Sequence, residues 1–391
     1  DHQTVDDQLL RPKGLGLQPV AYIPGPRAEV RDAVARDIQR VFLAGAARRQ
    51  LACAKLHRIT GREVSLIIMA RKITSRTWNV HSTRRAKLSI VDCTRQAFLT
   101  DIPCVASKEW IDMHNIRVGT APDSWGVWFP SDPRQIPWQR FLDEVVEAGY
   151  EWIEAGPLGY LPTDPKILRR ELDDRGLSMV ATTAMDGHFE DPNDWDRIEK
   201  QALAAGELGA NMGAKHFVLI DDAYLDLNTG QRVTHTNLDQ DSWNRLIDTV
   251  NAVARMIKEK FGTPVTVHPN SQTHIETESH LEFILEQTDP DLVSLCVDTG
   301  HLAYTGGDPV SFIRKHSDRV SYLHLKDVDG QKRTEAINRK LPMVTATEIG
   351  VFCEPPRGVV GFERLAVVLK EIGYDGWATV EQDMYKPSLD V

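Results

Sequence analysis

The stretch LVSLCVDTGHLAYTGGDP, residues 292–309, predicts a buried β-strand that ends in an acid and is followed by a glycine and a histidine. A short apolar run bounded by turn residues is typical of a strand buried on both faces, as in a parallel sheet. Asp298 therefore stands where the core ends, and a sharp turn at Gly300 is expected to present His301 beside it. A carboxylate and an imidazole at the mouth of a buried strand indicate a functional site.

Similar runs recur along the chain from residue 116, so the predicted strands are 116–121, 150–155, 177–183, 215–220, 264–268, 292–298, 319–326 and 376–382. Helical patterns separate them at 137–149, 165–176, 193–212, 240–261, 277–288, 308–318 and 362–373, with entry signals such as TDP at 163–165 and GGDP at 306–309. Eight strands alternating with helices predict an α/β fold, a (β/α)8 TIM barrel over 113–391. A doubly wound open sheet is the alternative, but no G-x-G-x-x-G follows the first strand.

Residues 1–112 do not share this alternation. Apart from a possible helix at 28–49 and an apolar run at 64–70, the segment is polar, basic and without period. Such a composition is typical of a poorly ordered segment. We therefore expect an N-terminal extension that carries no chemistry.

Composition limits the partners and the compartment. Residues 1–115 hold 19 Lys and Arg against 11 Asp and Glu, whereas the remainder holds 27 against 45. An acidic barrel region argues against nucleic acid, and no apolar run is long enough for a membrane helix. The acidic first residues lack the pattern of a secretory signal, and five scattered cysteines without a CxxC pair suggest reduced thiols. We expect a cytoplasmic protein with a small-molecule substrate; a homo-oligomer is compatible with the sequence.

The carboxyl ends of the predicted strands carry groups that ligate cations or move protons. Those ends hold Asp123, Trp125, Glu154, His188, Asp221, Asp222, His268, Asp298, His301, His324, Lys326, Glu381 and Asp383. In a barrel these ends meet around one axis, where active sites form. Singly each residue is readily explained as a helix cap or a solvated charge. Together, carboxylates and imidazoles indicate a divalent cation such as Mn2+, Co2+, Zn2+ or Mg2+.

At these residues the chain resembles the xylose isomerase-like sugar isomerase/epimerase superfamily, and within it the inosose dehydratase group. The resemblance covers about 116–385 and lies in GTAPDSWGVWFP (119–130), GYEWIEAGPLGYLPTD (149–164), VHPNSQTHIET (267–277), DTGHLAYTGGDP (298–309), HLKDV (324–328) and VEQD (380–383). It implies one divalent metal ion, of which Mn2+ and Co2+ are the first candidates, held by Asp298, His324 and Glu381. The fifth-strand ligand that it implies is His268 or Glu276.

The resemblance also implies a reaction. A dehydratase of 2-keto-myo-inositol (inosose) or a related keto-cyclitol removes a proton next to a ketone and then expels a hydroxyl as water. Glu154, His301 and Lys326 are the candidates for catalytic roles. The candidates for binding substrate are Trp125 with Trp128, His188, and Arg357 in the long segment 327–361, which could form a lid.

Three alternatives remain at this point. A keto-sugar isomerase or epimerase, or a lyase of oxidised sugars or glycosides, would share the first half of the chemistry. An endonuclease-IV-like phosphodiesterase shares the barrel but needs a basic surface, which the acidic barrel region lacks. A barrel that only binds a sugar would not need so many ligating groups.

Overall fold

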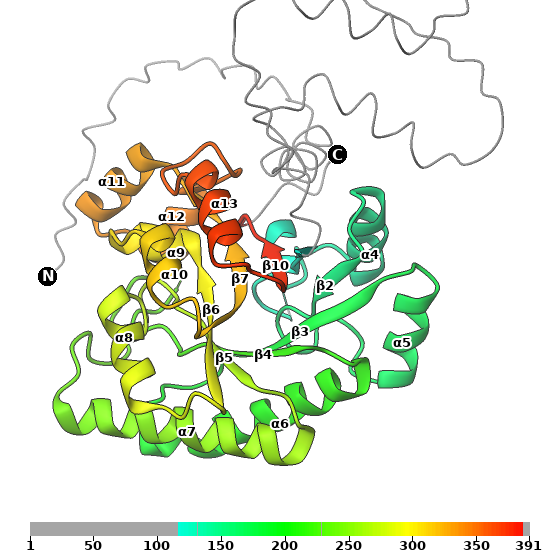
Figure 1. Cartoon of the computed structure of the whole chain (residues 1–391), viewed down its shortest axis with the longest axis horizontal. Helices are drawn as coiled ribbons and strands as arrows, with labels where there is room; N and C mark the ends of the chain where they lie inside the picture. The colour runs from blue at the N-terminus through cyan, green and yellow to red at the C-terminus, as the bar shows by residue number, and fades with distance from the viewer. Residues whose placement is uncertain (1–115, 131, 228, 386–391) are drawn as a thin grey trace, which may run out of the picture.

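The computed structural model describes residues 116–385 apart from 131 and 228 (Figure 1). Eight parallel strands close into a barrel in the order β1-β10-β7-β6-β5-β4-β3-β2. The strands are β1 (Arg117–Thr120), β2 (Trp152–Glu154), β3 (Ser178–Ala184), β4 (His216–Leu219), β5 (Val265–Val267), β6 (Val293–Asp298), β7 (Val320–Leu325) and β10 (Trp377–Val380). Every strand of the barrel lies within a predicted one except β3, which extends one residue further, to Ala184. The (β/α)8 barrel is thus confirmed, while the expectation for residues 1–112 lies outside the described residues.

Helices connect successive strands and cover the outside of the barrel (Figure 1). The seven helices that were predicted are α4 (Trp138–Glu147), α5 (Pro165–Asp173), α6 (Trp195–Met212), α7 (Gln240–Phe261), α8 (Glu278–Gln287), α10 (Pro309–Lys315) and α13 (Phe362–Glu371). The entry signals act as expected: the Asp164 side chain accepts hydrogen bonds from the backbone N–H groups of Lys166 and Ile167, with Pro165 at the first helical position. Within the described residues, no helix is both long enough and apolar enough to cross a membrane.

The expected turn at Gly300 is wrong, because the chain enters helix α9 (Thr299–Thr305) directly. Asp298 caps this helix: its side chain accepts a hydrogen bond of 2.8 Å from the backbone N–H of His301. Glycine is needed at 300 for close packing and not for a turn, since a Cβ there would lie 2.5 Å from Cγ of Lys326. The cap points Oδ2 of Asp298 away from the helix, into the barrel mouth.

The long segment 327–361 has secondary structure of its own. It contains β8 (Asp327–Val328), α11 (Gly330–Arg339), α12 (Met343–Glu348) and β9 (Phe352–Cys353), and β8 pairs with β9 in an antiparallel hairpin. The buried carboxylate of Asp327 accepts hydrogen bonds from the backbone of Gly358 and Val360 and so anchors the return of the chain. These bonds tie the end of the segment back to its first strand.

Candidate active site

The carboxyl ends of the strands surround one pocket whose deepest part is polar. Parallel register brings distant residues together there: Asp298 on β6 pairs with His324 on β7, and Thr379 on β10 also pairs with His324. Glu381 follows two residues after Thr379. The buried polar residues that line the pocket are Glu154, His268, Ser271, His301, His324, Lys326, Glu381 and Asp383, with half-buried Asp123 and Asn270.

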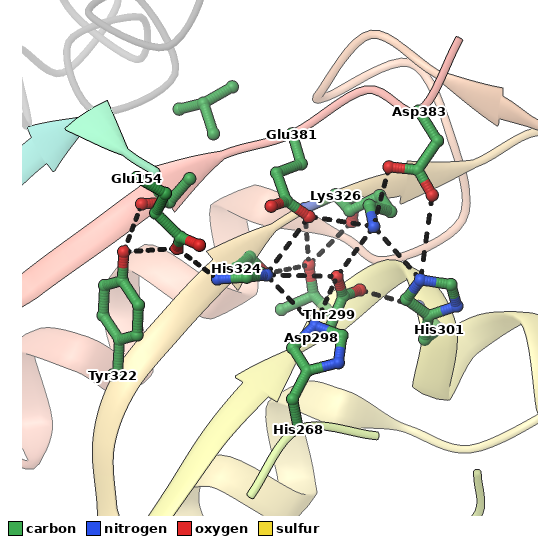
Figure 2. Close-up of polar contacts among 12 residues, drawn as sticks. Glu154, His268, Asp298, Thr299, His301, Tyr322, His324, Lys326, Glu381 and Asp383 are labelled. Carbon is green, nitrogen blue, oxygen red and sulfur yellow. Dashed lines mark hydrogen bonds and ion pairs between the residues drawn. The ribbon is translucent and has the colours of Figure 1, made fainter. Parts of the chain in front are cut away.

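Four side chains from four strand ends form a buried cluster of donor atoms (Figure 2). His268 Nε2 lies 3.0 Å from His324 Nδ1 and 3.4 Å from Asp298 Oδ2, and His324 Nδ1 lies 3.1 Å from Glu381 Oε2. One atom from each residue lies within 4.8 Å of the others. Asp298 Oδ2 is fully buried, and besides the two imidazoles it faces the ammonium of Lys326 at 3.0 Å. A buried carboxylate oxygen facing two imidazoles and a second carboxylate fits a divalent cation.

Glu154 lies behind this cluster and orients one of its members. Its Oε1 lies 2.6 Å from Nε2 of His324 and 2.5 Å from the hydroxyl of Tyr322, and all three side chains are buried (Figure 2). With a cation bound, an N–H donated from Nε2 to the carboxylate would leave the lone pair of His324 on Nδ1, which faces the cluster. Histidines that bind a metal commonly donate their other ring N–H to a carboxylate in this way.

Lys326 supplies positive charge within the same buried space. Its Nζ lies 3.0 Å from Asp298 Oδ2, 2.9 Å from Glu381 Oε2 and 2.9 Å from Asp383 Oδ1. Burial lowers the pKa of Lys326, but these carboxylates outweigh it and raise the pKa well above its usual value. The lysine is therefore an ammonium whose three protons face three carboxylates.

His301 lies on the other side of Lys326. Its Nδ1 accepts a hydrogen bond of 3.1 Å from the backbone N–H of Ser271, and Ser271 Oγ is 2.9 Å away. The other ring nitrogen, Nε2, lies 3.1 Å from Lys326 Nζ and 3.7 Å from Asp383 Oδ2. Burial, and next the charge of Lys326, lower the pKa of His301 well below its usual value, so the ring is neutral.

Nearer the solvent the pocket is apolar. It is lined there by Trp128, Phe129, Met185, Leu227 and Met343, of which Met185 is 36% exposed whereas Lys326 at the bottom is 2% exposed. Sequence reasoning did not identify Leu227, Met343, Ser271 or Tyr322. Leu227 and Met343 belong to long connections, where periodicity gives no signal, and the contact of Ser271 with His301 depends on the path of the chain after β5.

Two predicted site residues are placed elsewhere by the structure. Trp125 is a core residue: its indole packs edge-on against Phe141 and donates a 2.7 Å hydrogen bond to Glu144 on α4. Glu276 lies outside the four-residue cluster, because its carboxylate accepts hydrogen bonds from the backbone N–H of Gln272 and the hydroxyl of Tyr224. Of the two candidates for the fifth-strand ligand, only His268 reaches the cluster.

Two further candidates do not line the pocket. Arg357 has a side chain 62% exposed and pairs with Glu354 at 3.3 Å, so it points to solvent. His188 is half-buried beside the mouth, and its backbone N–H donates to Asp194. His188 was expected from its position near a strand end and Arg357 from the long segment 327–361, but neither position determines the direction of the side chain.

The barrel and its buried cluster define a class: a (β/α)8 protein with candidate cation ligands on its strand ends. The family model described as xylose isomerase-like TIM barrel matches residues 142–390, and the chain belongs to this family. It is 30% identical over 278 residues to the inosose dehydratase of Geobacillus thermodenitrificans strain NG80-2, covering 69% of this chain and 90% of that protein. The expected family is confirmed, and the chain is an enzyme of this superfamily.

Solved structures agree with the fold. The probable 3-DHS dehydratase AsbF of Bacillus anthracis has a TM-score of 0.54 at 13% identity, covering 70% of this chain and 94% of that one. The IOLI protein with a binding zinc atom has a TM-score of 0.52 at 16% identity, covering 69% of this chain and 90% of that one. At these identities the likeness concerns the architecture alone.

Proposed function

We propose that this enzyme is a metal-dependent dehydratase that removes water from 2-keto-myo-inositol (inosose) or a related keto-cyclitol. The observation that carries the proposal is the buried cluster of one donor atom each from His268, Asp298, His324 and Glu381. Supporting it, the related inosose dehydratases align with about nine-tenths of their own length. Among the described residues that line the acidic pocket, Lys326 is the one lysine or arginine, which suits an uncharged substrate better than a phosphorylated one.

The four cluster residues would hold one divalent ion. Two imidazole nitrogens with two carboxylates favour Mn2+, Co2+ or Zn2+ over Mg2+, which prefers all-oxygen sites. When bound, the ion supplies Lewis acidity that stabilises negative charge developing on the ketone oxygen of the substrate. Glu154 keeps His324 in the tautomer that leaves Nδ1 available, which makes it a positioning residue.

The chain's own groups move the protons. Asp383 lines the pocket, and burial raises its pKa to about 6, so its carboxylate can take the proton next to the ketone near neutral pH. Lys326 then gives a proton to the departing hydroxide. Asp383 Oδ1 lies 2.9 Å from Lys326 Nζ, so the abstracted proton returns directly to the lysine. One C–H and one C–O bond break, one C=C bond forms, and water leaves with no net change in the enzyme.

His301 positions the substrate. Its Nε2 lies beside Lys326 and Asp383, where it can form a hydrogen bond with a substrate hydroxyl. Trp128 and Phe129 offer an apolar surface to the C–H face of a ring. These residues hold the reacting C–H bond toward Asp383, and orientation of that kind contributes strongly to rate.

The test is to incubate the metal-loaded enzyme with 2-keto-myo-inositol and follow the ultraviolet absorbance of the dione product. The Asp298→Ala variant is expected to lose bound metal and activity together, because the cluster loses a buried carboxylate. Full activity in this variant would show that the ligand assignment is wrong. Turnover of a ketohexose with no change in 2-keto-myo-inositol would instead indicate an isomerase or epimerase.

A further inference from the structure

A second buried charged cluster lies beside the active site and centres on His274. This residue belongs to the connection between β5 and α8 and is 2% exposed. Its Nδ1 lies 3.1 Å from Asp221 Oδ2 and 3.4 Å from Glu190 Oε2, while its Nε2 lies 2.6 Å from the carbonyl oxygen of His235. Both ring nitrogens face only acceptors, so both carry protons.

The cation of this cluster is the imidazolium itself. Burial opposes its charge, but the hydrogen bonds to Asp221 and Glu190 outweigh burial and raise the pKa of His274 to about 10. The bond from His274 in turn lowers the pKa of Glu190 to about 2, against the effect of burial.

The cluster joins three connections at the barrel mouth. Asp221 follows β4, and its Oδ1 accepts a 3.1 Å hydrogen bond from the backbone of Phe189 in the β3–α6 connection. Glu190 of that connection accepts a 2.9 Å hydrogen bond from Thr234 in the β4–α7 connection. His274 thus holds the β5–α8 connection to the β3–α6 and β4–α7 connections.

The same β5–α8 connection carries Ser271, whose backbone N–H and Oγ face Nδ1 of His301. Between Ser271 and His274 lies Gln272, which has a φ of 66° although it is not a glycine. This backbone conformation is disfavoured and persists where its surroundings hold it. Its backbone N–H donates to Glu276 at 2.8 Å, and its side chain bonds Leu341 and Met343 at the edge of the pocket.

We propose that His274 is a positioning residue for the reaction: by tying the β5–α8 connection to Asp221 and Glu190, it holds Ser271 against His301. The ring of His301 then stays directed toward Lys326 and Asp383, where its Nε2 lies 3.1 Å from Lys326 Nζ. Only the kinetic test of this role of His274 rests on the proposed function, because the contacts of His274 and Ser271 do not involve the substrate.

The kinetic test compares His274→Gln, Ser271→Ala and the double variant in the full chain loaded with Mn2+ or Zn2+. We expect His274→Gln to lower kcat by about 10- to 100-fold with little change in KM, because misplaced catalytic groups cost about that much. If His274 acts through Ser271, the double variant is no slower than the slower single variant. Independent, additive losses in kcat would overturn the proposal, since they are the result of a general loss of order.

A second measurement needs no substrate. Nitrogen-15 NMR of the histidine rings should show His274 doubly protonated, and His274→Gln should shift the His301 resonances in the same direction as Ser271→Ala. The matched control is His316→Gln, because His316 also pairs with a carboxylate, Glu282 at 3.1 Å, but lies at the end of α10. This control should leave the His301 resonances unchanged.

The two measurements separate the two proposals. If the wild-type enzyme does not turn over 2-keto-myo-inositol, the proposed function fails, and the NMR comparison still decides the role of His274. If His274→Gln does not fold, Glu190→Gln removes one carboxylate charge while leaving the bond to Asp221, and a smaller shift of His301 is expected. Unchanged His301 resonances in whichever folded variant is measured would overturn the proposal.

Discussion

Replacing Glu154 with glutamine tests how the site holds a cation. The carboxylate is 3% exposed and accepts from His324 Nε2 at 2.6 Å and from Tyr322 at 2.5 Å. Glutamine keeps the shape and can still accept the His324 N–H, so the variant removes the charge alone. A hydrogen bond to a charged group contributes about 1 to 2 kcal/mol more than a neutral one. Since about 1.4 kcal/mol is a tenfold change, the Kd for the cation should rise by about 5- to 30-fold.

The assay is titration of the metal-free protein with Zn2+ or Mn2+, followed by calorimetry or by competition with a chelator. Glu276→Gln is the matched control, because Glu276 also accepts from a tyrosine hydroxyl, that of Tyr224 at 3.2 Å, yet lies outside the cluster. Its affinity for the ion should stay within about twofold of the wild type. The reasoning is refuted if Glu154→Gln binds the ion as tightly as the wild type, or if Glu276→Gln weakens binding equally.

Three further outcomes are expected. Lys326→Met should lower kcat by about 100-fold or more, because a proton donor contributes that much to the rate. Metal analysis should show that the variant retains bound metal. Unchanged turnover would exclude the lysine as the acid. Trp125→Phe should lower the free energy of unfolding, measured by chemical denaturation, by about 1 to 2 kcal/mol, because the variant loses a buried hydrogen bond in the core. Its KM should be unaltered. An altered KM would show that Trp125 contacts the substrate. The difference in unfolding free energy between the wild type and His274→Gln should be largest near pH 6 and shrink as the pH rises toward 10. The reason is that the pKa of His274 is raised to about 10 in the folded protein, and the stabilisation from its charged ring is lost when the ring is deprotonated. A difference that widens with pH would contradict a charged His274.

The architecture could be read from the sequence because each of its elements leaves a local signal. The buried strand 293–298 shows as an apolar run, and helix α5 shows as an aspartate followed by proline and an amphipathic segment. Alternation of the two kinds of segment leaves few arrangements besides a parallel barrel. Helices α11 and α12 were missed, because the short, polar α11 buries only Ala336 and so lacks a clear apolar face.

For the site, sequence position proved a partial guide. Asp298, His324 and Glu381 stand at strand ends whose register the barrel fixes, so their meeting could be expected from the fold. Trp125 and Glu276 also follow strands, but a short helix turns the first toward α4, and a tight turn pairs the second with Gln272.

By itself, then, the sequence determined the barrel, its family and the strand ends that face a common mouth, because burial and periodicity act over a few neighbouring residues. Only the tertiary structure decided that His268 and not Glu276 joins the cluster, that Glu154 supports His324, and that His274 joins three connections. Those outcomes depend on the direction of single side chains across distances of a few ångströms. Such directions are set by packing and hydrogen bonds between segments that are far apart in the chain.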